Sequence, residues 1–298
     1  MPEVISTYGL TKRYGRSRGL EDLDLTVRRG EVFGFLGPNG AGKTTTIRTL
    51  LDLLHPTSGT ATIFGLDSRR DSRAIRSRVG NLPGEFAFED RLTGRSLLKL
   101  FARLRGMNDF GDAEALAKRF NSDLSRPLRD LSRGNRQKIG LIQALFHDPE
   151  LLVLDEPTAG LDPLMQEEFL ALIEERRDRG VTVFLSSHDL AEVERVCDRV
   201  GIIRDGRLAA VEEVSEMRGH AYRKVEVKLR QSADTANLEA LPGVQGFTSS
   251  GLELSFRTAE ALDPMISKLS ELPVADLEVT RPTLEELFLT YYDQHAAQ

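Results

Sequence analysis

The sequence has little that suggests disulfides, membrane spans or nucleic-acid binding. Its single cysteine, Cys197, excludes an intramolecular disulfide framework and a cysteine-rich zinc site, and it suits a reducing, cytoplasmic setting. We expect Cys197 to be a buried apolar side chain on a helix with Leu190, Val193 and Val200. No apolar run approaches the ~20 residues of a membrane-spanning helix, and residues 1–10 lack the basic and apolar regions of an export signal. With a net charge of -6, the sequence lacks the excess of basic residues that nucleic-acid binding requires. We therefore expect no nucleic-acid partner.

What the sequence does contain is typical of a folded chain with two domains. Hydrophobic residues make up 40% and charged residues 29% of the 298 positions, a length that exceeds what one core usually organises. Leu92–Phe146 has helical spacing without a good strand, which predicts a helical insertion at about residues 85–146. A polar connector at 212–219 separates a predicted large domain, residues 1–218, from a small one, residues 219–298.

The large domain has the pattern of an α/β fold. Short apolar runs at Glu31–Leu36, Leu151–Leu154 and Val181–Leu185 predict strands that are buried on both faces. Helical periodicity follows the first run over Thr44–Leu54 and separates the other two over Glu167–Arg177. The helical insertion is therefore expected to interrupt a sheet of parallel strands joined by helices.

The small domain alternates strand-like and helix-like segments. The predicted strands are 225–229, 244–247, 252–256 and 277–279, and the predicted helices are 233–241 and 261–269. This β–α–β–β–α–β order predicts a small ferredoxin-like α+β domain. Past Pro282, a further helix is predicted because four apolar side chains share one helical face: Leu284, Leu287, Phe288 and Tyr291.

A phosphate-binding loop is the most specific motif of the chain. Gly37–Thr44 (GPNGAGKT) matches G-x-x-x-x-G-K-[ST] between a predicted strand and a predicted helix, so a mere glycine-rich turn is the weaker alternative. Backbone N–H groups of such a P-loop converge on phosphate oxygens. We expect Lys43 to reach the β- and γ-phosphates and the Thr44 hydroxyl to bind Mg²⁺. The other residues expected at the nucleotide are Asn39, Gly40, Ala41, Gly42 and Thr45.

Polar side chains also follow the other two predicted strands. Asp155 ends one of them, where a P-loop needs its second Mg²⁺ ligand, and Glu156 is well placed to orient a water for attack on the γ-phosphorus. His188 ends the next strand, where we expect it beside Asp155, donating to the γ-phosphate and holding the water. The alternatives are an acidic pair that caps a helix and a structural histidine.

Taken in order, these residues resemble the nucleotide-binding subunit of ABC transporters over roughly residues 3–215. The resemblance implies that the ring of Tyr14 stacks on adenine. It implies that Ser132 and Gly134, at the place of the family's LSGGQ signature, contact the γ-phosphate bound to the opposite subunit. A helix is predicted to follow this signature, from Arg136 to Phe146. The resemblance also implies that Asp162 lies in the D-loop, which crosses the dimer seam.

The sequence departs from the family pattern at two places. In the signature, Arg133 replaces a glycine and Asn135 a glutamine, which is tolerable because the phosphate-facing serine and glycine remain. Gly84 stands where the family has a glutamine that reaches Mg²⁺ or the attacking water. Either Glu85 substitutes for it through a shifted backbone, or water alone makes that contact. We expect hydrolysis to persist with altered coupling to the membrane partner.

The small domain resembles the accessory domain of ABC-2-type, drug-export-like ATPases, including their ending at Arg281–Leu289. Together the resemblances imply an ATPase that binds ATP and Mg²⁺ and powers transport, in the direction of export, through a separate transmembrane permease. They imply that two copies form a homodimer around two ATP molecules. They also imply a peripheral position on the cytoplasmic face of the cell membrane.

Other functions remain open at this point. ABC-type ATPases that act on DNA or ribosomes use the same cassette, but they typically carry two cassettes, a long coiled coil or zinc-binding cysteines, which are not visible in this sequence. Gly84 and the altered signature would also suit a weakly hydrolysing regulatory module. A GTPase is disfavoured because the sequence has no Asn-Lys-x-Asp element that reads guanine.

Overall fold

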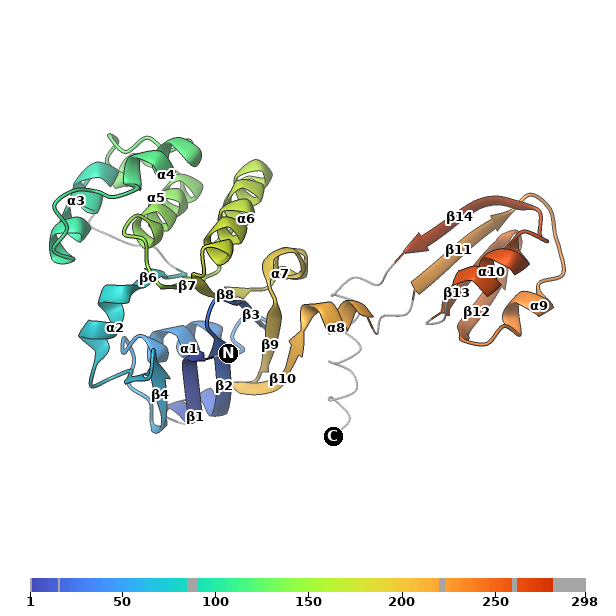
Figure 1. The fold of residues 1–298 in the computed structure, drawn as a ribbon, viewed down its shortest axis with the longest axis horizontal. Coiled ribbons are helices and arrows are strands. Elements are labelled where there is room, and N and C mark those ends of the chain that lie inside the picture. The colour runs from blue at the N-terminus through green and yellow to red at the C-terminus, as the bar shows by residue number, and fades with distance from the viewer. Residues whose placement is uncertain (1, 16, 85–90, 220–222, 259–261, 281–298) are drawn as a thin grey trace. The chain divides into compact units, whose positions relative to one another are not determined.

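The computed structural model describes residues 2–15, 17–84, 91–219, 223–258 and 262–280 (Figure 1). The chain divides into two compact units: unit 1 is Met1–Glu213 and unit 2 is Val214–Gln298. The predicted domain boundary after residue 218 stays a prediction. Glu85 and the helix predicted past Pro282 lie outside the described residues.

Unit 1 is built on a six-stranded sheet of order β10-β9-β3-β8-β7-β6. The strands are β3 (Val32–Leu36), β6 (Val79–Leu82), β7 (Leu151–Asp155), β8 (Thr182–Ser187), β9 (Arg199–Arg204) and β10 (Arg207–Glu213). All pairs are parallel except β9 with β10. Every residue of β3, β7 and β8 is buried, which confirms the predicted α/β core. Because parallel strands end at one edge, the residues that follow these three strands meet there.

Unit 1 also contains an antiparallel sheet that the sequence analysis misses. Its order is β2-β1-β4-β5, with β1 at Glu3–Tyr14, β2 at Ser17–Arg28, β4 at Ser58–Ile63 and β5 at Leu66–Asp67. Several register shifts between β1 and β2 interrupt the two-residue alternation that would otherwise predict strands. Apolar residues of this sheet share one core with Phe33 of the central sheet.

The helices of unit 1 connect its strands and form the insertion. The connecting helices are α1 (Lys43–Leu50), α2 (Ser72–Arg78), α6 (Pro163–Asp178) and α7 (Leu190–Val196). Among residues 91–150 of the described chain, the structure has α3 (Gly94–Leu104), α4 (Ala113–Arg119), a 3-10 turn (Leu128–Asp130) and α5 (Arg133–Leu145). This segment lies between β6 and β7, as expected for the helical insertion.

The start of α5 differs from the prediction. The sequence places it at Arg136, whereas the helix begins at Arg133. The Ser132 hydroxyl accepts a hydrogen bond from the Asn135 N–H group (3.3 Å) and so caps the helix three residues earlier. The signature residues therefore form the N-terminus of a helix rather than a loop before it.

The surroundings of Cys197 also differ from the prediction. The sequence places it on a helix with Val200, but α7 ends at Val196, Cys197 has an extended backbone, and Val200 lies on β9. The thiol is buried, and burial raises its pKa well above the usual value. Cys197 therefore behaves as a small apolar side chain rather than as a reactive thiolate.

Unit 2 begins with α8 (Val214–Gly219), where the sequence predicts only a polar connector, and continues with an antiparallel four-stranded sheet. Its elements are β11 (Arg223–Leu229), α9 (Ala236–Glu239), β12 (Val244–Ser250), β13 (Glu253–Thr258), α10 (Leu262–Leu269) and β14 (Val274–Thr280). The sheet order is β12-β13-β11-β14. Its assignment to the ferredoxin-like class stays a prediction.

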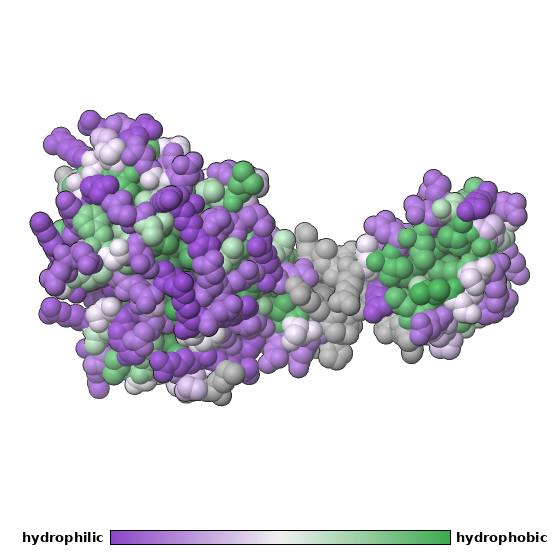
Figure 2. Space-filling model, turned by 45° about the horizontal axis from the view of Figure 1, so that its top comes forward, coloured by the Kyte–Doolittle hydropathy of each residue, from purple (hydrophilic) through white to green (hydrophobic). Residues whose placement is uncertain are grey.

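One face of the unit 2 sheet is covered and the other is open. Val225 and Val227 of β11 are buried with residues of α9 and α10 in a separate apolar core. Figure 2 shows an apolar area on unit 2. Ile266, Leu277 and Val279 are 49%, 40% and 37% exposed, so unit 2 carries uncovered apolar side chains of the kind that protein contacts use.

Candidate active site

The P-loop joins β3 to α1, as predicted. Gly40 and Gly42 have φ angles of 82° and 116°, a left-handed backbone that glycine adopts without strain. A Cβ at Gly42 would lie 2.9 Å from the carbonyl oxygen of Gly19, and one at Gly37 would lie 2.4 Å from a carbonyl of β9. The loop conformation therefore requires glycine at these places. Of the remaining loop residues, Asn39 is exposed, Ala41 is buried, and Thr44 and Thr45 are half-buried in the first turn of α1.

The ammonium group of Lys43 lies between the P-loop and the end of β7. Its side chain is 6% exposed, its Nζ donates to the carbonyl of Gly37 (2.5 Å), and the same atom lies 3.2 Å from Oε1 of Glu156. A buried cation whose neighbours in the described ranges are backbone carbonyls and one carboxylate is well suited to meet phosphate oxygens.

Glu156 and His188 are in contact at the ends of β7 and β8. Oε2 of Glu156 lies 2.6 Å from Nδ1 of His188. The sequence predicts His188 beside Asp155, but its partner is Glu156. The reason is the backbone of Glu156, whose φ of 51° is left-handed and whose N–H donates to the carbonyl (3.2 Å) and hydroxyl (3.1 Å) of Ser186. These bonds turn the chain toward the end of β8.

Asp155 is held in a fixed orientation. Its side chain is 1% exposed, and Oδ1 accepts a hydrogen bond from the Ser186 hydroxyl (2.6 Å). A Cβ built at Gly84 would lie 2.9 Å from Oδ2 of Asp155. Gly84 therefore stands directly against this carboxylate, and a larger residue there requires Asp155 or the Gly84 backbone to move. The coupling hypothesis for Gly84 stays a prediction.

Gly19 lies between the ring of Tyr14 and the P-loop. Tyr14 is 47% exposed at the end of β1, and a Cβ at Gly19 would come within 2.7 Å of its ring. The carbonyl of Gly19 in turn approaches Gly42 of the P-loop. The exposed ring is therefore near the loop, on a surface that a flat base can reach.

The signature residues pack against the D-loop of the same chain. A Cβ at Gly134 would lie 2.4 Å from the carbonyl oxygen of Gly160, so the two backbones touch. Ser132 is exposed at the N-terminus of α5, and Asp162 is exposed as the N-cap of α6, where it accepts a hydrogen bond from the Met165 N–H group (3.1 Å). Among the described residues, no hydrogen bond or ion pair joins Ser132 or Asp162 to the P-loop.

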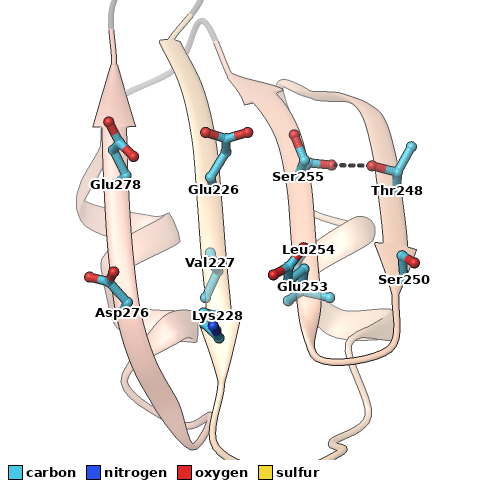
Figure 3. A pocket seen from close by; sticks show the side chains of 10 residues that line it. All are labelled: Glu226, Val227, Lys228, Thr248, Ser250, Glu253, Leu254, Ser255, Asp276 and Glu278. Carbon is cyan, nitrogen blue, oxygen red and sulfur yellow. Dashed lines mark hydrogen bonds between the residues drawn. The ribbon is translucent and has the colours of Figure 1, made fainter.

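A separate hollow of about 420 Å³ lies on the open face of the unit 2 sheet (Figure 3). Carboxylates dominate its charged lining, with Glu226, Glu253, Asp276 and Glu278 against Lys228. Carboxylates repel phosphate groups. This hollow is therefore unsuited to a nucleotide, and the candidate site is the strand edge of unit 1.

Comparison with known proteins agrees with this geometry. The family model described as ABC transporter matches residues 20–159. The chain is 40% identical over 211 residues to the bacitracin transport ATP-binding protein BcrA of Bacillus licheniformis, covering 70% of this chain and 69% of that protein. It is 36% identical over 299 residues to the daunorubicin resistance ATP-binding protein DrrA3 of Streptomyces coeruleorubidus, covering 96% and 95%.

The chain belongs to the ABC transporter family. It is the ATP-binding subunit of such a transporter, an ATPase that uses ATP and Mg²⁺. A solved structure with the same fold is that of the ATP-binding cassette MJ0796, a dimer in a post-hydrolysis state bound to ADP and Pi. Its TM-score is 0.65 at 22% identity, covering 70% of this chain and 98% of that one. The relatives favour transport over a role in DNA or ribosome handling.

The ABC site has the oxygen ligands that Mg²⁺ prefers. The Thr44 hydroxyl and the Asp155 carboxylate would hold the ion, together with phosphate oxygens of the nucleotide. The Ser186 hydroxyl bonds Oδ1 of Asp155, whereas Oδ2 of the same carboxylate faces Gly84. When bound, Mg²⁺ neutralises charge on the phosphates.

Two residues of this ABC site were missed by the sequence analysis. Ser186 donates from its hydroxyl to the Asp155 carboxylate and accepts from the backbone N–H group of Glu156. It is the register partner of Asp155 in the β7–β8 pair. Gln137 of α5 donates from Nε2 to the backbone carbonyls of Glu156 (3.2 Å) and Pro157 (3.0 Å). Nothing in the local sequence points to this long-range contact.

Proposed function

We propose that Glu156 is the general base of ATP hydrolysis and that His188 and Lys43 act beside it. The observation that carries this proposal is the contact chain in which one carboxylate meets Lys43 (3.2 Å) and His188 (2.6 Å). Glu156 accepts a proton from water as the water oxygen bonds to the γ-phosphorus. The bond from that phosphorus to the bridging oxygen of ADP breaks, and ADP and phosphate result. Lys43 stabilises the negative charge on the transferred group.

Two copies of the chain complete each other's sites in this proposal. Tyr14, the P-loop residues Asn39–Thr45 and Asp155 of one copy bind ATP from one side. Ser132 and Gly134 of the second copy bind its γ-phosphate from the other side, with the N-terminus of α5 directed at the anion. The exposure of Ser132 and Asp162 supports this arrangement. Hydrolysis removes the terminal charge that both faces hold, and the dimer opens.

A groove beside the helical insertion is the surface that we assign to the permease. Its volume is about 200 Å³, and its lining comes from the core (Leu51 and Leu53) and from the insertion (Phe101 and Arg105). Within the described part of the chain, the buried Nε atom of half-buried Arg105 has no hydrogen-bond partner. An apolar residue of a permease loop would fill the groove, and a carbonyl or carboxylate beside it would accept from Arg105.

The transport role follows the named relatives. One is named for bacitracin transport and the other for daunorubicin resistance. We propose that this subunit powers export of a comparable toxic compound through a separate permease, from the cytoplasmic face of the membrane. No helix in the described ranges is long and apolar enough to cross a bilayer.

The substitution Glu156→Gln tests the proposal. It preserves shape and removes the base, so ATP binding should persist while hydrolysis falls at least about 100-fold. The trapped ATP should then hold two copies together, which size-exclusion chromatography with ATP and Mg²⁺ measures as a dimer. The matched control is Glu226→Gln, a carboxylate on the open sheet of unit 2, which should hydrolyse ATP normally. Wild-type turnover by Glu156→Gln contradicts the base role, and a monomer with bound ATP contradicts the shared site.

A further inference from the structure

Glu192 is a buried carboxyl that hydrolysis itself does not require. It lies in the first turn of α7 and is 8% exposed. Its Oε2 accepts a hydrogen bond from the Ser187 hydroxyl (3.0 Å). The Thr158 side chain also interacts with the carboxyl, in the direction that lowers its pKa. Burying a carboxyl costs free energy that an apolar residue of the same size would not. Its presence therefore needs an explanation beyond the packing of α7.

The two partners of Glu192 belong to the two loops that meet in the active site. Thr158 lies two residues after Glu156, on the segment that leads into the D-loop. Ser187 directly precedes His188 at the end of β8. Both partners are themselves buried, at 6% and 2% exposure. The Glu192 carboxyl thus connects the loop that carries Glu156 to the loop that carries His188.

Hydrogen bonds around Ser187 and at the start of α7 hold Glu192 in place. Ser187 also accepts a hydrogen bond from the Asp189 N–H group (2.9 Å), and the Asp189 carboxylate caps α7 through the N–H groups of Ala191 and Glu192. Burial raises the pKa of the Glu192 carboxyl, and the negative charges of Asp189 and Glu156 add to this shift. Glutamine, which is neutral and has the same shape, is therefore a conservative replacement.

We propose that Glu192 is a positioning residue that keeps Glu156 and His188 in contact by tying Thr158 to Ser187. It touches neither ATP nor the reacting atoms in this arrangement. The inference rests on the proposed roles of Glu156 and His188. If loss of Glu192 let these loops separate by about 1 Å, general-base catalysis would weaken, because its rate depends steeply on geometry.

The test compares Glu192→Ala with Glu192→Gln in the full chain. We expect Glu192→Ala to lower kcat for ATP hydrolysis by about 10- to 100-fold, with ATP affinity within about 2-fold of wild type. Glu192→Gln should keep most of the activity, because an amide can still bond both Ser187 and Thr158. Glu194→Ala, on the same helix, is the control for loss of a glutamate from α7 and should behave as wild type.

Three further outcomes decide between positioning and a purely structural role. In the double variant Glu192→Ala/His188→Ala, the two losses should not add, because both act through one contact. Unchanged kcat in Glu192→Ala overturns the inference. Parallel loss of kcat, ATP affinity and thermal stability, without rescue by glutamine, also overturns it. Glu156→Gln, measured alongside, separates the proposals: if that variant hydrolyses ATP normally, the proposed function fails, whatever Glu192 does.

Discussion

The two units of the chain place their carboxylates in opposite surroundings. In unit 1, Asp155 and Glu192 are 1% and 8% exposed, and each accepts a hydrogen bond from a serine hydroxyl at the end of β8. In unit 2, Glu226, Asp276 and Glu278 line an open sheet face (Figure 3). Buried carboxylates cost free energy, and exposed ones do not. The difference indicates that chemistry belongs to unit 1 and that the charges of unit 2 maintain a solvated surface.

The largest effect is expected from a matched pair of lysines, one in each unit. Lys43 is buried between the P-loop and Glu156, whereas Lys228 lies opposite Glu253 and Asp276 on the open sheet. Lys43→Met should lower ATP hydrolysis at least about 100-fold, because the charge that meets the phosphates is lost. Lys228→Met should leave turnover unchanged. A steady-state ATPase assay measures both, and equal losses would remove the distinction between the units.

The sequence predicts the catalytic strand edge because its signals are local and repeated. Three apolar runs, each followed by polar or glycine-rich residues, suffice to predict parallel strands that end together, and Lys43, Asp155 and Glu156 follow from that arrangement. The partner of His188 could not be predicted in the same way. It depends on the left-handed backbone of Glu156 and its bonds to Ser186, which no local pattern indicates.

The strand predictions show the same contrast between regular and irregular segments. Two strands of unit 2, β11 and β13, alternate cleanly: in β11, Val225, Val227 and Leu229 are buried and the residues between them are not. The sequence predicts these strands at nearly the observed positions. The β1–β2 pair carries four register shifts, and its alternation is lost. Local periodicity therefore predicts β11 and β13, whose burial alternates, and misses β1 and β2, whose alternation is interrupted.

A smaller effect is expected from the contact between Gly84 and Asp155. The substitution Gly84→Ala places a Cβ 2.9 Å from Oδ2 of Asp155, so the carboxylate or the backbone at residue 84 must shift. Because Asp155 would hold Mg²⁺, the Mg²⁺ concentration that gives half-maximal ATPase activity should rise by about 10-fold. Titration of Mg²⁺ at saturating ATP measures this. Ser186→Ala, which removes the other constraint on Asp155, should shift the titration in the same direction.

An unchanged Mg²⁺ requirement in both variants would show that the orientation of Asp155 is not critical. The contrast between a buried, tightly held carboxylate in unit 1 and the carboxylates on the open sheet of unit 2 would then have no functional meaning. A loss of maximal rate without a shift in the titration would instead indicate that Gly84 acts on the attacking water rather than on the metal.

The smallest effect is expected from removing unit 2. A chain that ends after Glu213 keeps every residue of the proposed site, and the solved cassette MJ0796 matches 70% of this chain while 98% of its own length is covered. Basal ATP hydrolysis should therefore stay within about 2-fold of the full chain. Thermal unfolding of the truncated chain is the control, because it shows whether the shortened chain still folds. A truncated chain that folds and binds ATP but does not hydrolyse it would mean that unit 2 contributes to assembly of the shared site, and that its open sheet and exposed apolar side chains serve the dimer rather than another partner.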